Sequence, residues 1–231
     1  VLGAFPALLL VVAAVLQELE VLPPAWLDAA FLRCVALGGG LLLTALLCLP
    51  VWQTAAAMLR DGRVGCELCA GVAVLADLLC CVSGAVTGST LSTPYAAAGA
   101  LLILSCQLGL YLTAESRRIA FHLADVNGVP PYVVSVLPAG VCKQRGVLEG
   151  FYRTTMRPDP ARQWQNYVLP LLLSAAVVLS GVVCFTARPM EEFPWVLAAL
   201  TGAGVQLSLP LTGALPLYYL SRRLERSGAA A

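Results

Sequence analysis

The chain has 231 residues, of which 59% are hydrophobic and only 12% are charged, and its net charge is +1 at pH 7. Soluble domains have about 45–50% apolar and about 25% charged residues, so a soluble fold of this length could not bury so many apolar side chains. The near-neutral charge also excludes nucleic acid as an expected partner, because nucleic-acid-binding domains are basic. We therefore expect an all-α polytopic membrane protein in contact with the lipid bilayer. Because the chain begins with Val1, we also expect that residues are missing at one or both ends.

Six apolar runs have the length of membrane helices, which is about 17–25 residues. They lie at residues 1–19, 29–51, 68–87, 95–113, 168–187 and 193–220. The second run contains Gly38, Gly39 and Gly40. These glycines predict either a kink that lays residues 52–60 along the membrane surface, or close packing against a neighbouring helix.

The loops indicate the orientation and the domain organisation. If six helices alternate in direction, 12 of the 14 Lys and Arg residues fall on one side of the membrane. Cytoplasmic loops are enriched in these residues, so both termini are expected in the cytoplasm. We then divide the chain into a four-helix membrane segment at 1–114, a small cytoplasmic module at 115–167, a two-helix membrane segment at 168–220 and a cytoplasmic linker at 221–231. Within the module, residues 132–137 are β-like and are followed by Pro138 and Gly140.

The last apolar run contains Pro210 and Pro216 well inside it, and a proline removes a backbone N–H and disrupts the preceding helical turn. Inside a membrane, the carbonyl groups freed in this way must find partners in protein or water, and transporters use such broken helices to bind ions. We therefore expect this helix to break at mid-depth and to form an ion pathway from Gln206, Ser208, Pro210, Thr212 and Pro216. Oxygen ligands of this kind suit hard cations better than copper.

A second expected site surrounds Asp77, which lies inside the third helix. A carboxylate within a membrane is costly and marks a functional site by default. Cys80 and Cys81 neighbour Asp77 on the helix surface, and Cys106 on the fourth helix could face them, so these four residues could bind copper or zinc. The alternative is a protonated or hydrogen-bonded Asp near a helix end, surrounded by cysteines that pack as small apolar residues. No catalytic residue is assigned, because the chain contains no Ser/His/Asp set, Walker loop or zinc-protease motif.

The layout resembles the first membrane half of heavy-metal-transporting P-type ATPases. The features that carry this resemblance are Gly38-Gly39 at a kink, Leu49-Pro50-Val51-Trp52 near a platform helix, a loop in the actuator position, and Pro210 with Pro216 at a six-residue spacing. In that family, helix six carries a Cys-Pro-Cys metal site and runs into the phosphorylation domain. The resemblance implies transport of a metal cation, with ATP and magnesium bound only if a catalytic domain follows this chain; no cofactor is assigned to the chain itself.

Three motifs of that family are missing. Leu209 and Leu211 flank Pro210 where the family has cysteines, the loop lacks Thr-Gly-Glu-Ser, and Asp-Lys-Thr-Gly does not occur in these residues. The departures favour a non-catalytic pseudo-pump that has a regulatory role or binds a protein partner on the cytoplasmic side. Two alternatives stay open: the membrane domain of an active ATP-driven cation transporter whose catalytic domains lie outside this chain, and an unrelated channel or secondary transporter.

Overall fold

The computed structural model describes residues 3–19, 21, 29–87, 95–124, 132–137, 140–146, 153, 160–205 and 207–227. Most of them are helical, and the helices are α1 (Ala4–Glu18), α3 (Ala30–Leu47), α4 (Leu49–Arg60), α5 (Cys66–Thr87), α6 (Ala96–Ala124), α8 (Pro160–Thr186), the short 3₁₀ helix η1 (Met190–Glu192), α9 (Phe193–Gly204) and α10 (Leu211–Arg226). Two strands, β1 (Tyr132–Leu137) and β2 (Gly140–Arg145), form an antiparallel pair. The described fold is therefore a helical bundle with one hairpin.

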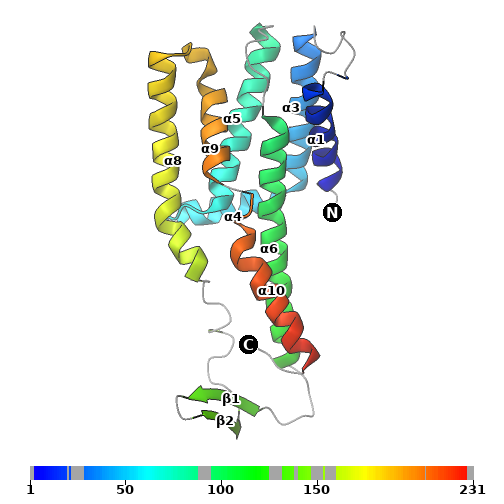
Figure 1. Ribbon diagram of the computed structural model, residues 1–231, viewed down its shortest axis with the longest axis vertical. Coiled ribbons are helices and arrows are strands. Elements are labelled where there is room, and N and C mark those ends of the chain that lie inside the picture. Colours follow the sequence, from blue (N-terminus) through cyan, green and yellow to red (C-terminus); the bar gives the residue numbers. More distant parts are fainter. Residues whose placement is uncertain are drawn as a thin grey trace.

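The bundle is of the membrane type. In Figure 1, α1, α3, α5, α8 and α9 run side by side together with the first part of α6. Among the described residues, four helices are long and apolar enough to cross a membrane, namely α3, α5, α6 and α8, and α1 is a shorter apolar helix. The outside of the bundle is also apolar, since Phe5, Leu79, Leu171 and Phe185 are all at least 60% exposed. Exposed apolar surface of this extent indicates contact with lipid, so the chain is a membrane protein.

The glycines of α3 serve close packing, and the bend predicted there lies further along the chain. A Cβ atom on Gly38 would lie 3.0 Å from Cβ of Cys81, and one on Gly40 would lie 2.9 Å from a methyl carbon of Leu10. The helix passes through this stretch unbroken and ends at Leu47. The bend follows at Cys48, two residues before Pro50, whose missing N–H cannot continue the helical hydrogen bonds. Beyond it, α4 lies across the end of the bundle (Figure 1).

The last apolar run breaks, but near one end of the bundle rather than at the mid-depth that the sequence predicts. Helix α9 ends at Gly204 and α10 begins at Leu211, directly after Pro210. In Figure 1 this gap lies at the level of α4, and α10 continues beside the second part of α6. Helix α10 runs without interruption through Pro216. Only the neighbourhood of Pro210 therefore forms the break.

The hairpin lies beyond the far end of α6 in Figure 1. Its register pairs Tyr132 with Arg145 and Leu137 with Gly140, so β1 covers the residues for which the sequence predicts a strand. Tyr132, Val134 and Val141 are each more than half exposed. Because these apolar side chains are exposed, the hairpin has no core of its own. An isolated pair of strands of this kind is marginally stable at best in water.

Candidate functional site

The break between α9 and α10 is closed by hydrogen bonds from the chain itself. The side-chain amide of Gln165, on α8, donates to the carbonyl oxygen of Leu209 at 3.2 Å. The hydroxyl of Thr212 donates to the same oxygen at 3.1 Å and to the carbonyl oxygen of Ser208 at 2.9 Å. The backbone N–H of Leu211 also donates to the Ser208 carbonyl, at 2.9 Å. The carbonyl groups of Ser208, which the sequence assigns to the ion pathway, and of the neighbouring Leu209 are thus already hydrogen-bonded within the protein.

The carbonyl group of Pro210 faces α6 at close range. A Cβ atom on Gly109 would lie 2.7 Å from this oxygen and 3.2 Å from its carbon, so only glycine leaves room for the backbone there. Gln206, which the sequence assigns to the ion pathway, lies outside the described residues. Pro216 is exposed on α10, two turns beyond the break. Among the described residues, Ser208, Pro210 and Thr212 lie together at the break, and Pro216 does not join them.

Asp77 lies near the middle of α5, opposite the start of α6. Its residue surface is only 2% exposed, and the backbone N–H of Tyr95 hydrogen-bonds to its carboxyl group. Tyr95 immediately precedes α6, so Asp77 acts as a cap for the N-terminus of that helix, supplied from a different helix. The Oδ1 atom of Asp77 is buried and has no hydrogen-bond partner. One oxygen of this carboxyl group therefore accepts a hydrogen bond within the fold, and the other oxygen accepts none.

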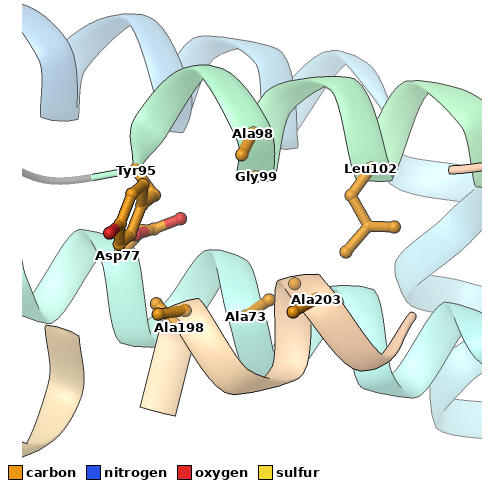
Figure 2. Close-up of a pocket in the computed structure, with 10 residues that line it drawn as sticks. Ala73, Asp77, Tyr95, Ala98, Gly99, Leu102, Ala198 and Ala203 are labelled. Atoms are coloured by element: carbon orange, nitrogen blue, oxygen red, sulfur yellow. The ribbon is translucent and has the colours of Figure 1, made fainter. Parts of the chain in front are cut away.

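A cavity of about 260 Å³ adjoins Asp77 between α5, α6 and α9. Figure 2 shows Ala98, Gly99 and Leu102 of α6 on one side and Ala198 and Ala203 of α9 on the other. Asp77 and Tyr95 lie together at one end of this space (Figure 2). The cavity is lined mainly by small apolar residues, with one carboxyl group among them.

The metal site predicted from Asp77, Cys80, Cys81 and Cys106 is not assembled. The thiol of Cys106 donates to the carbonyl oxygen of Cys66 at 3.8 Å, at the opposite end of α5 from Cys80 and Cys81. Cys81 instead packs against Gly38 of α3. In the parts of the chain that the structure describes, no group of three or more His, Cys, Asp or Glu side chains could hold a metal ion. The four residues fail to meet because helical spacing brings Cys80 and Cys81 towards α3, whereas Cys106 follows α6 towards the other end.

An aromatic and charged cluster holds the start of α9 beside the cavity. The rings of Tyr95 and Trp195 stack with their centroids 5.3 Å apart and an interplanar angle of 26°. The guanidinium of Arg188 lies 5.7 Å from the Trp195 ring and forms a salt bridge of 3.1 Å with Glu192, which is only 6% exposed. These contacts join the segment before α9 to the start of α6, and so they fix two walls of the cavity relative to each other.

Sequence reasoning missed Gln165, Gly109 and Tyr95. Gln165 lies before the apolar part of α8, where a polar residue is usually interpreted as a solvated helix end. Its partner Leu209 is 44 positions away in the sequence, and only the fold brings the two together. Gly109 gives a weak signal, because a glycine inside a membrane helix indicates close packing without naming the neighbour. Tyr95 acts through its backbone N–H, which no side-chain pattern can reveal.

Comparisons with protein-family models, curated proteins and solved structures found no match. The resemblance to P-type ATPases therefore stays a prediction.

Proposed function

We propose that the chain is a non-catalytic integral membrane protein with the layout of a P-type pump, and that it binds or regulates a protein partner on the cytoplasmic side. One observation carries the proposal: the break in the last apolar run is closed by Gln165 and Thr212. In a transport site, freed carbonyl groups have to be available to the ion. Here the Leu209 and Ser208 oxygens already accept hydrogen bonds, which supports a structural role for the break.

The proposed topology has six spans with both termini in the cytoplasm. Helices α1 and α9, of 15 and 12 residues, would complete the set of four longer helices. Helix α4 would lie on the cytoplasmic surface, and the residues beyond it, in the second part of α6 and in α10, would project into the cytoplasm. Basic residues on these two helices, namely Arg117, Arg118, Arg222, Arg223 and Arg226, agree with this orientation.

The partner-binding surface is proposed on α10, where the chain leaves the bundle. Tyr219 is 68% exposed and Leu220 is 50% exposed, although both belong to the part that we place outside the membrane. Next to them, Arg222 is held by Glu225 at 3.1 Å and by the hydroxyl of Tyr218 at 3.1 Å. Exposed aromatic residues beside arginine are typical of protein interfaces.

Photo-crosslinking in intact membranes tests the partner. A photoreactive amino acid at position 219 should give a discrete protein adduct. The matched control is position 185, because Phe185 is also highly exposed, at 84%, but lies on α8 among residues that we place against lipid. No adduct from position 219, or the same adducts from both positions, would contradict a partner on α10.

A second function, the membrane domain of an active cation transporter, is favoured by the position of Pro210 in a break of the last apolar run. Calorimetric titration of the purified chain with K⁺, Ca²⁺ and Zn²⁺ separates the two proposals. The pseudo-pump should show no saturable binding that depends on the break. Saturable binding that Thr212→Val weakens and Asp77→Asn leaves intact would favour the transporter instead.

A further inference from the structure

The carboxyl group of Asp77 at the cavity has no positively charged side chain among the described residues that line the cavity. Asp77 is 2% exposed, and its Oδ1 atom has no hydrogen-bond partner. Leaving a buried carboxylate unpaired inside a membrane protein is costly, and such groups pair with cations or backbone groups. The N-terminus of α6 supplies one hydrogen bond through Tyr95. Among the described residues that line the cavity there is no Lys, Arg or His. A cation that enters the cavity would therefore complete the site.

The carboxyl group is held firmly in place. A Cβ atom on Gly99 would lie 2.7 Å from Oδ2 of Asp77, so the glycine leaves room for the carboxyl group against α6. Together with the hydrogen bond from Tyr95, this contact fixes one oxygen against the start of α6. Figure 2 shows the carboxyl group of Asp77 at one end of the cavity. A fixed acceptor lowers the ordering cost of binding.

The remaining lining argues against a bare metal ion. Besides Asp77 and Tyr95, the cavity is lined by Ala73, Ala98, Gly99, Leu102, Ala198, Ala199, Gly202 and Ala203. None of these side chains carries an oxygen ligand, whereas Ca²⁺ takes about six to eight oxygens and Mg²⁺ about six. The volume of about 260 Å³ is also far larger than one ion needs, and it approaches the range of small-molecule pockets, which begins at about 300 Å³. One acidic group in an apolar cavity matches a ligand with one positive charge and an apolar body.

The cavity opens on the outside of the bundle. Ala98 of α6 and Ala203 of α9 are exposed, and Figure 2 shows them on opposite sides of the space. Because this face of the bundle is apolar, a ligand would enter between α6 and α9 from the bilayer side. An amphiphilic cation concentrates in that environment, whereas an inorganic ion does not.

We propose that the cavity between α5, α6 and α9 is a binding site for a small organic cation, a primary ammonium on a short alkyl chain, with Asp77 as its counter-charge. The ammonium would donate to Oδ1, and the alkyl chain would lie along the alanine and glycine residues. This site is distinct from the break and from the proposed partner surface on α10, and it does not depend on either.

Calorimetric titration of the purified chain in an uncharged maltoside detergent tests the site, with n-pentylammonium as the probe. We expect saturable binding at one site per chain, and affinity reduced by roughly tenfold or more in Asp77→Asn. The asparagine keeps an oxygen that can accept the Tyr95 N–H, so the cap of α6 is retained. Asp61→Asn is the matched control, because Asp61 is exposed at the end of α4. It should bind the probe as the wild type does.

A second variant tests the site with Asp77 unchanged. Ala203→Leu places a larger side chain at the rim and should also weaken binding by roughly tenfold, whereas Ala175→Leu, at an exposed position of α8, should not. The neutral analogue 1-pentanol and K⁺ should both bind at least roughly tenfold more weakly than pentylammonium. The proposal is overturned if the wild type shows no saturable binding, if Ala203→Leu binds unchanged, or if pentanol or K⁺ binds as tightly as pentylammonium.

Discussion

Gly109 of α6 and Pro210 of the break lie so close that a Cβ atom on Gly109 would be 2.7 Å from the Pro210 carbonyl oxygen. The contact is with backbone, which cannot rotate away as a flexible side chain can. The start of α10 can thus pack against α6 because position 109 has no side chain. Any enlargement at position 109 has to move either α6 or the break.

Gly109→Ala should therefore destabilise the protein by about 1–3 kcal/mol, the usual cost of overpacking. Thermal unfolding in detergent micelles, followed by circular dichroism, measures the change. Gly181→Ala on α8 is the matched control, because a Cβ atom there would meet nothing within 4 Å. That control should be neutral or stabilise the helix by up to about 1 kcal/mol. Equal effects of the two substitutions would show that Gly109 is not a packing position.

Gln165 and Thr212 should act together, since both donate to the carbonyl oxygen of Leu209. Gln165→Ala alone should cost about 1 kcal/mol, because Thr212 still satisfies the oxygen. Thr212→Val alone should cost a similar amount. With both donors removed the oxygen is left unsatisfied, so the double variant should cost about 0.5–3 kcal/mol more than the sum of the single variants. The same unfolding measurement provides this double-mutant cycle. Strict additivity would mean that the two side chains do not share the Leu209 oxygen.

A hydrogen bond spans the bend between α3 and α4: the indole N–H of Trp52 donates to the carbonyl oxygen of Ala45 at 3.1 Å. The same ring lies against Gly71 of α5, where a Cβ atom would come within 3.1 Å of it. Trp52→Phe keeps most of this packing and removes the donor, so we expect a loss of about 1 kcal/mol in the free energy of unfolding. Trp164→Phe is the control, because Trp164 is 61% exposed on α8. A loss as large in the control would contradict a specific role for the Trp52 hydrogen bond.

Apolar runs predicted most of the helices because their length and composition are local properties of the chain. The pattern correctly placed the cores of α3, α5, α6 and α8. It placed the bend of the second run at Gly38–Gly40, because glycines occur both at kinks and at close helix contacts. The bend instead lies beside Pro50, and Gly38 and Gly40 are packing positions. It also predicted a break at mid-depth in the last run, whereas the break between α9 and α10 lies near one end of the bundle. Depth in the bundle depends on how the helices align with one another, which hydropathy does not encode.

The candidate sites were harder to predict, for the same reason. Asp77 stood out by its charge within an apolar helix, but its neighbours come from backbone and from small residues on two other helices. The metal-binding chemistry of thiols suggested a site at Cys80, Cys81 and Cys106. In the fold, Cys106 hydrogen-bonds to Cys66 and Cys81 packs against Gly38, so the thiols have different neighbours. Residue type therefore indicated one side chain of the proposed site, and packing determines the residues around it.

Cys142 on β2 offers a test of orientation. All nine cysteines are free; eight of them are buried, and Cys142 is partly exposed. A membrane-impermeant maleimide should therefore add one label to the folded protein, and up to nine after denaturation, as measured by intact mass. The proposed topology places the hairpin in the cytoplasm, so the single label should appear in inside-out vesicles and not in right-side-out vesicles. Cys142→Ser should remove it, whereas Cys184→Ser, at a buried position of α8, should not. In the proposed topology an even number of spans lies on either side of the hairpin, so the hairpin and both termini are on the same side of the membrane. If right-side-out vesicles were labelled at Cys142, the hairpin would lie outside, and this result would contradict cytoplasmic termini.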